Sequence, residues 1–231
     1  MKKKIPVNLL QILEVWFAAG ITCVKCCNYF SNFYLLCCGI HQGGVLSPYL
    51  LAVYIDSVID KVRQRGAGCE ERLSRVGILL YADDILLIAP TVTGLQTMLK
   101  ACEIELAYLY MTINPTKSVC LRIGSDWKST LVNISTHDGA QITWQQSCRY
   151  LGVHIVAGRM FSCSLDYAKC SFYRAFNAVY CKVGGVASEE IVLHLVKSKC
   201  MPLLLYETEA IPLKKAQIKS AEYAVYASYA S

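Results

Sequence analysis

The sequence lacks an uninterrupted apolar run as long as a membrane span, although apolar residues make up 55% of its 231 positions. A helix that crosses a bilayer needs about 20 consecutive apolar residues. The two most apolar stretches, residues 78–90 and 191–205, are interrupted by aspartates or by a histidine and lysines. The basic start Met1–Lys4 is followed by polar side chains and by no evident cleavage site. We therefore expect a non-secreted, intracellular protein without a membrane span, in either the nucleus or the cytoplasm.

Cysteine and histidine pairs at zinc-ligand spacing are also lacking, despite 13 cysteines. Cys23, Cys26 and Cys27 lie close together and precede Cys37 and Cys38, but no matching pair recurs along the chain. A disulfide framework is typical of small secreted domains. Free cysteine behaves as a small hydrophobic residue, which is how we interpret most of these side chains. A zinc-binding or membrane-associated module remains an alternative.

Acidic residues are scarce at the start of the chain, where Glu14 is the only Asp or Glu before Asp56. The 23 Lys and Arg residues exceed the 17 Asp and Glu residues and give a formal net charge of +6. The basic residues are spread along the chain rather than gathered in one tail. This charge fits an acidic partner such as nucleic acid, although it indicates no particular site.

The chain shows no internal repeat and no low-complexity linker, and the period of its apolar residues predicts a mixture of helices and strands. We expect helices over residues 6–19, 47–66, 93–110, 165–181, 188–205 and 214–229. Strands are expected over residues 21–27, 33–38, 78–88, 119–123 and 148–155, and near Ile134 and Ile142. Ser47-Pro48 is typical of an N-cap followed by proline at the first helical position. The pattern becomes wholly helical near residue 160, the one candidate domain boundary.

The stretch Ile78–Ile88 predicts a hairpin, because two apolar arms flank Tyr81-Ala82-Asp83-Asp84. Two adjacent carboxylates repel one another unless one is protonated or a cation lies between them. Mg²⁺ takes one or two protein carboxylates and completes its shell with water and phosphate oxygens. A magnesium site therefore fits this turn, and a plain polar turn is the alternative, because aspartate is common in turns.

Three further motifs follow a fixed order around this hairpin: Gln42-Gly43-Gly44-Val45-Leu46-Ser47-Pro48 before a helix, Asn114 with Lys117-Ser118 after the next helix, and Tyr150-Leu151-Gly152 in a later strand. This ordered set resembles the palm of reverse transcriptases, in particular the non-LTR (LINE-type) retrotransposon group. Pro6-Val7 with Trp16, and the run Leu204–Ala210, also resemble that group. The resemblance extends from residue 5 to about residue 222.

The resemblance implies an α+β fold, a polymerase palm in which helices pack on one face of a small antiparallel sheet, over residues 1–160. Residues 161–231 would form a truncated helical thumb that holds duplex nucleic acid through basic side chains. The implied candidates are Lys169, Arg174, Lys182, Lys197 and Lys199. The implied reaction is template-directed DNA synthesis on RNA by two-metal nucleotidyl transfer, with RNA template, DNA primer and dNTP as partners.

The resemblance also implies a role for individual residues. Asp83 and Asp84 would bind Mg²⁺, and Tyr81 would line the floor beneath the primer end. Lys117 would neutralise or protonate the leaving pyrophosphate. Backbone close to template and nucleotide would come from Gln42, Gly43 and Gly44, and the primer would be gripped by Tyr150, Leu151 and Gly152. His41 occupies a position where the family normally has arginine. The planar guanidinium of arginine can bind phosphate through two hydrogen bonds, which the imidazole of histidine cannot do.

One element of the family pattern is missing, the first metal-binding aspartate on a strand before the first helix. Because Glu14 falls within the predicted helix, no residue of the printed sequence can take that place. We expect the fingers, the first palm strand and this aspartate to come from an N-terminal half of the same polyprotein. The chain alone is then a fragment with little or no polymerase activity, or alternatively a catalytically dead remnant that still binds nucleic acid.

Overall fold

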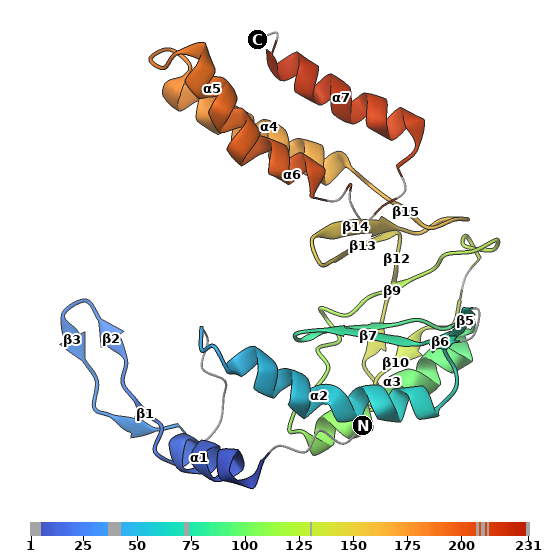
Figure 1. Ribbon diagram of the computed structural model, residues 1–231. Coiled ribbons are helices and arrows are strands. Elements are labelled where there is room, and N and C mark those ends of the chain that lie inside the picture. The colour runs from blue at the N-terminus through green and yellow to red at the C-terminus, as the bar shows by residue number, and fades with distance from the viewer. Residues whose placement is uncertain are drawn as a thin grey trace. The chain divides into compact units, whose positions relative to one another are not determined.

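The computed structural model describes residues 6–36, 43–71, 74–129, 131–206, 208, 211 and 213–229 (Figure 1). The chain divides into two compact units, Met1–Thr112 and Ile113–Ser231, and each is described here by itself. Both units combine helices with short strands, which confirms the mixed α and β class. The predicted palm and thumb boundary at residue 160 lies inside the second unit and stays a prediction.

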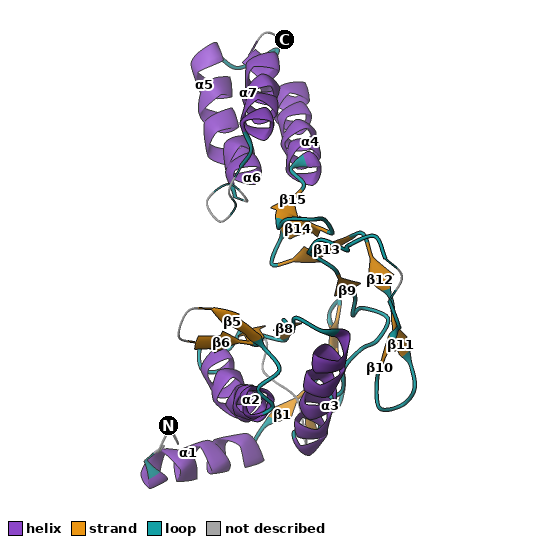
Figure 2. Cartoon of the chain, turned by 90° about the vertical axis from the view of Figure 1, so that its right-hand side faces the viewer, coloured by secondary structure: helices purple, strands orange, loops and turns teal. Residues whose placement is uncertain are grey.

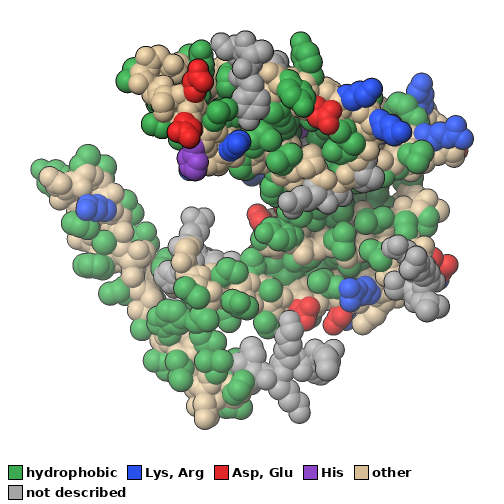
Figure 3. Space-filling view, turned by 45° about the horizontal axis from the view of Figure 1, so that its top comes forward, with side chains coloured by type: hydrophobic (Ala, Val, Ile, Leu, Met, Phe, Trp, Pro, Cys, Tyr) green, Lys and Arg blue, Asp and Glu red, His purple; other side chains and the backbone are tan. Residues whose placement is uncertain are grey.

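The first unit begins with a helix and a hairpin that bury nothing. Helix α1 spans Val7–Ala18, close to the predicted bounds. Strands β1 (Ile21–Thr22) and β4 (Tyr34–Leu35) pair, as do β2 (Lys25–Cys26) and β3 (Tyr29–Phe30), within one antiparallel hairpin. No residue in the described range 6–36 is buried. Many of its apolar side chains therefore face water. Figure 3 shows hydrophobic side chains of the whole molecule over much of the visible face.

Two helices and one hairpin form the core of the first unit. Helices α2 (Ser47–Gln64) and α3 (Val92–Tyr108) pack together; α2 also contacts β7 (Ile78–Tyr81) and α3 contacts β8 (Asp84–Leu87). The fully or nearly fully buried side chains are Ile55, Val58, Val62, Ile78, Met98, Leu99, Ala101, Cys102 and Leu106. Apart from Ile78, these residues recur at helical spacing, so burial of one face per helix explains why both helices form here.

The predicted N-cap at Ser47 is wrong. Ser47 is the first helical residue of α2, and the capping position belongs to Leu46, which already has helical backbone angles and makes no side-chain cap bond. Pro48 still lies in the first turn, where its missing N–H is harmless. In contrast, Thr91 caps α3 by accepting a hydrogen bond from the Gly94 amide at 3.1 Å.

A second hairpin contacts the start of the hairpin that carries the aspartates. Its strands are β5 (Cys69–Glu71) and β6 (Ser74–Val76), and they bring Gly68 against Gly77, the residue just before β7. A Cβ on Gly68 would lie 2.7 Å from the Gly77 Cα. Only two glycines permit this backbone contact. The contact lies immediately before the first residue of β7.

The second unit starts with short strands. They are β9 (Cys120–Leu121), β10 (Ile134–Ser135), β11 (Gln141–Ile142), β12 (Trp144–Gln145), β13 (Ser147–Tyr150), β14 (Val153–Val156) and β15 (Ser162–Cys163). Strands β9 and β12 are parallel, whereas β10–β11 and β13–β14–β15 are antiparallel. In the described part of both units, the strands form seven sheets of two or three strands. A single palm sheet therefore stays a prediction.

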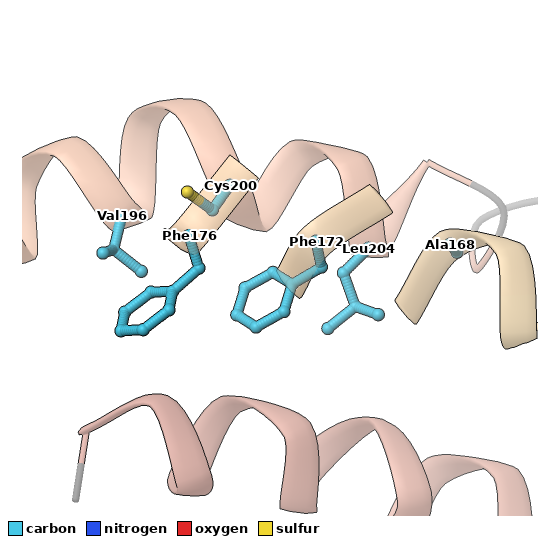
Figure 4. Packing of buried hydrophobic residues seen from close by; sticks show 6 residues of the cluster. All are labelled: Ala168, Phe172, Phe176, Val196, Cys200 and Leu204. Atoms are coloured by element: carbon cyan, nitrogen blue, oxygen red, sulfur yellow. The ribbon is translucent and has the colours of Figure 1, made fainter. Parts of the chain in front are cut away.

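Four helical segments complete the second unit, and Figure 2 shows them side by side. They are α4 (Asp166–Val183), α5 (Glu189–Leu195), α6 (Met201–Leu205) and α7 (Lys215–Tyr229), with a π-helical turn η1 (Val196–Cys200) between α5 and α6. Their core consists of Ala168, Phe172, Phe176, Val196, Cys200 and Leu204 (Figure 4). Ala221 and Val225 of α7 pack against it. None of the described helices is long and apolar enough to cross a bilayer.

Candidate functional site

The predicted hairpin around the two aspartates is confirmed. Its pairs run from Ile78 with Leu87 to Tyr81 with Asp84, so the turn consists of Ala82 and Asp83. Asp84 is thus the first residue of β8 rather than a turn residue. Ala82 has φ of +51°, a left-handed conformation that costs an L-residue about 1 kcal/mol or more. Such local strain is common where a turn must present a particular side chain.

The hairpin has one covered face and one open face. Side chains alternate along a strand, and directly paired residues share a face. Ile78 is buried on the covered face, toward the helices. Tyr81 and Asp84, which pair across the hairpin, lie on the open face, and Tyr81 is 65% exposed. The tyrosine ring and this carboxylate are therefore available to a bound molecule on the same side.

Both carboxylates are exposed, and within the described ranges neither forms an ion pair. Two open, adjacent carboxylates on a short turn fit the protein share of a Mg²⁺ shell, whose other ligands are water and phosphate oxygens. No group of three or more Asp, Glu, His or Cys side chains gathers anywhere among the residues that the structure places. The predicted metal role of Asp83 and Asp84 therefore stays a prediction.

The glycine loop before α2 is described only in part. Gly43 has φ of +83°, a conformation that favours glycine, and a Cβ there would meet no other atom within 4 Å. The predicted approach of nucleotide or template to this loop stays a prediction. Gln42 and His41, named with it from the sequence, lie outside the described residues.

Lys117 is held in a turn of the second unit. The Asn114 Oδ1 accepts hydrogen bonds from the amide and hydroxyl of Thr116, at 3.1 and 2.7 Å, which is typical of an asparagine-initiated turn. The Ser118 hydroxyl donates to the Asn114 carbonyl at 2.8 Å. This turn leaves Lys117 exposed. Since Asp83 belongs to the first unit, the predicted grouping of Lys117 with the aspartates stays a prediction.

Tyr150, Leu151 and Gly152 form the tight turn between β13 and β14. Tyr150 pairs with Val153, and the two central residues Leu151 and Gly152 have φ of +48° and +87°. Positive φ at both central positions is what a type I′ hairpin turn requires. Glycine suits the second position, whereas Leu151 adopts a conformation that is uncommon for a large apolar residue. A contact of this turn with primer stays a prediction.

A residue that the sequence did not single out lies against this turn. The ring of Tyr206, at the end of α6, occupies the space beside Gly152, and its hydroxyl donates to the Leu151 carbonyl at 3.3 Å. Tyr206 belongs to the run Leu204–Ala210, which resembles the family. Its position in the sequence does not show that it contacts the Leu151-Gly152 turn. The absence of a side chain at Gly152 thus leaves room for the ring of Tyr206, which belongs to the same unit.

Comparison with known proteins identifies the family of this chain. Residues 5–155 match the model described as reverse transcriptase (RNA-dependent DNA polymerase), which is more than half of the chain. The chain belongs to the reverse transcriptase family. The matched segment contains the Tyr81–Asp84 turn, Lys117 and the Tyr150–Gly152 turn, and helices α4 to α7 follow it.

The chain is also similar to the retrovirus-related Pol polyprotein from the type-1 retrotransposable element R2 of Nasonia vitripennis. The two are 24% identical over 160 residues, which is 66% of this chain and 16% of that protein. This similarity confirms the predicted non-LTR (LINE-type) group. The reverse transcriptase chain described here therefore spans a small part of the length of the curated relative that it matches.

Proposed function

We propose that this chain carries the Asp83 and Asp84 part of the metal site of an RNA-directed DNA polymerase that copies RNA into DNA. Asp83 is the principal metal ligand, and Asp84 assists it from the start of β8. The observation that carries the proposal is the two-residue turn at Ala82-Asp83, which leaves both carboxylates exposed on a hairpin backed by α2 and α3. Family membership supports the reaction class.

When bound, a pair of Mg²⁺ ions would activate the primer 3′-hydroxyl and stabilise charge on the leaving pyrophosphate. Asp83 and Asp84 hold their share of these ions, and Tyr81 lines the primer end on the open face of the hairpin. Lys117 neutralises or protonates the departing pyrophosphate. The loop that includes Gln42, Gly43 and Gly44 lets template and dNTP approach the backbone.

We further propose that the 231-residue chain does not extend a primer by itself. A two-metal site of this family needs another carboxylate, and Glu14, the one acid before Asp56, is an exposed residue of helix α1 rather than of a strand. The described residues gather no third metal-binding side chain. The missing carboxylate would come from a segment outside these 231 residues, such as an N-terminal part of the same polyprotein.

Primer extension on an RNA template with Mg²⁺ and dNTP tests both parts of this proposal. We expect no product from the chain alone. Template-dependent product that disappears in Asp83→Ala, but persists in the exposed control Asp138→Ala, would overturn the claim of inactivity and support the metal role of Asp83. Product that persists in Asp83→Ala would overturn the metal role itself.

A second candidate is a catalytically dead chain that still binds nucleic acid. It is favoured by Arg174, Lys182, Lys197 and Lys199, which are exposed on α4 and η1 of the second unit. Lys169 is less available, because it forms an ion pair with Asp166 at 2.9 Å. Binding of an RNA–DNA hybrid that weakens with salt and survives Asp83→Ala, without any extension, would identify this candidate.

A further inference from the structure

Tyr206 is fixed against the Leu151-Gly152 turn by two independent contacts. Its hydroxyl donates to the Leu151 carbonyl at 3.3 Å. Its ring carbon Cε1 lies 2.9 Å from the point where a Cβ on Gly152 would stand. Leu204, two residues earlier in α6, is 1% exposed in the core of the helices. The ring is therefore anchored from the core side and from the turn side.

The ring meets the turn with its edge. The two carbons bonded to Cε1, namely Cδ1 and Cζ, are both 3.7 Å from the same Cβ position. A ring lying face-on over that point would have all three carbons at similar distances, so the longer distances on both sides indicate an edge contact. Tyr206 is 64% exposed. The turn engages the edge and the hydroxyl, so the turn itself does not cover the faces of the ring.

The two strands joined by the turn carry no acidic residue; the acids nearest to Tyr206 in the sequence are Glu207 and Glu209. No Asp or Glu occurs between Asp138 and Asp166, whereas Arg149 and Arg159 both fall in that stretch. Arg149 is exposed on β13, one residue before Tyr150, and it pairs with His154 across the hairpin. A phosphate backbone that approaches this turn therefore meets the cationic side chain of Arg149 and no carboxylate from the two strands.

We propose that Tyr206 is a nucleic-acid contact, with an open ring face on which a base of a strand bound at the Leu151-Gly152 turn stacks. Proteins bind strands by pairing basic side chains, which track phosphates, with exposed aromatic rings, which stack on bases of any sequence. Arg149 and Tyr206 supply this pair at one turn. The partner is a polynucleotide strand read without sequence preference, and the inference rests on the proposed nucleic-acid-binding function.

Substitutions of Tyr206 that remove either the aromatic ring or only the hydroxyl should change hybrid affinity by different amounts. Tyr206→Leu keeps apolar bulk but removes the aromatic face, so hybrid affinity should fall roughly five- to 150-fold, as for loss of one stacked base. Tyr206→Phe keeps the face and loses only the bond to Leu151, so its loss should be clearly smaller. Tyr223→Leu, on α7, is the matched control, since Tyr223 is 72% exposed and should leave affinity unchanged.

The measurement is fluorescence anisotropy of a labelled RNA–DNA hybrid with a single-stranded overhang, titrated with the full chain in mild non-ionic detergent. A loss in Tyr206→Leu alone supports the proposal. Equal affinities for Tyr206→Leu and the unchanged chain would overturn it while leaving the proposed function intact. If the unchanged chain binds no hybrid, the nucleic-acid role and this inference are both wrong.

A second measurement covers the case in which Tyr206→Leu fails to fold. Ultraviolet crosslinking of the unchanged chain to the same hybrid, followed by mass spectrometry of its peptides, needs no substitution. We expect crosslinks on the peptide that contains Tyr206. Crosslinks confined to other peptides would contradict the proposal, even if overall binding is strong.

Discussion

The contact between Gly68 and Gly77 gives a direct way to perturb the hairpin that carries the aspartates. In Gly68→Ala, the new methyl group would lie 2.7 Å from the Gly77 Cα, 2.8 Å from its nitrogen and 2.9 Å from the Val76 carbonyl carbon. All three are backbone atoms. Gly77 cannot retreat freely, because its carbonyl accepts a hydrogen bond from the Ile88 amide at 2.8 Å. Relief of the overlap must therefore move the start of β7.

The expected cost follows from these contacts. Overpacking of a closed site costs about 1–3 kcal/mol, and loss of the bond from Ile88 to Gly77 costs about 1 kcal/mol. Replacing glycine with alanine also stabilises the folded state by about 0.4–1 kcal/mol, because it lowers the conformational entropy of the unfolded chain. We expect the free energy of opening of the β7–β8 hairpin to fall by about 1–3 kcal/mol, or roughly five- to 150-fold in its opening equilibrium.

Hydrogen–deuterium exchange with mass spectrometry measures this opening locally. In Gly68→Ala, amides of peptides that cover residues 78–88 should exchange faster, whereas peptides from α4 should not change. Gly185→Ala is the matched control, because a Cβ there would meet no atom within 4 Å. Unchanged exchange in residues 78–88, or an equal effect of Gly185→Ala, would refute the reasoning.

Three more outcomes are expected. Phe172→Ala should lower the free energy of unfolding of the helices α4 to α7 by about 3–5 kcal/mol, because Phe172 is 0% exposed in their core. Thermal or urea unfolding measures this, and a loss below about 1 kcal/mol would contradict it. Burial raises the pKa of the Cys102 thiol to about 12, so at pH 9.5 this buried thiol stays protonated, and iodoacetamide should label exposed Cys170 but leave Cys102 almost unlabelled. The exposed apolar side chains of residues 7–35 should make the chain self-associate without detergent; a monodisperse, cooperatively unfolding sample would count against this.

The sequence predicted the elements whose signal is local. The apolar period located α1, α3 and α4 to within a few residues, because burial of one face sets that period. The two apolar arms around Tyr81-Ala82-Asp83-Asp84 located the hairpin. The cap at Ser47 was wrong, since Leu46 already adopts helical angles. Residue type alone does not show at which residue a helix begins.

Contacts between distant residues could not be predicted in the same way. Gly68 and Gly77 are nine positions apart and Gly152 and Tyr206 are 54 apart, and the partners of each contact are not within one helix or one strand. Such contacts depend on how whole elements pack. The sequence indicated that glycine matters at Gly152, whereas the side chain that comes close to it was visible only in the structure.

The central claim is that Asp83 and Asp84 hold catalytic metal, and Mn²⁺ tests it most directly, because it prefers the same oxygen ligands as Mg²⁺. Electron paramagnetic resonance would measure Mn²⁺ bound by the full chain in the presence of dNTP, whose phosphates complete the shell. We predict that the unchanged chain and Asp138→Asn bind Mn²⁺ equally, and that Asp83→Asn loses this binding. Equal binding by all three proteins would contradict the account.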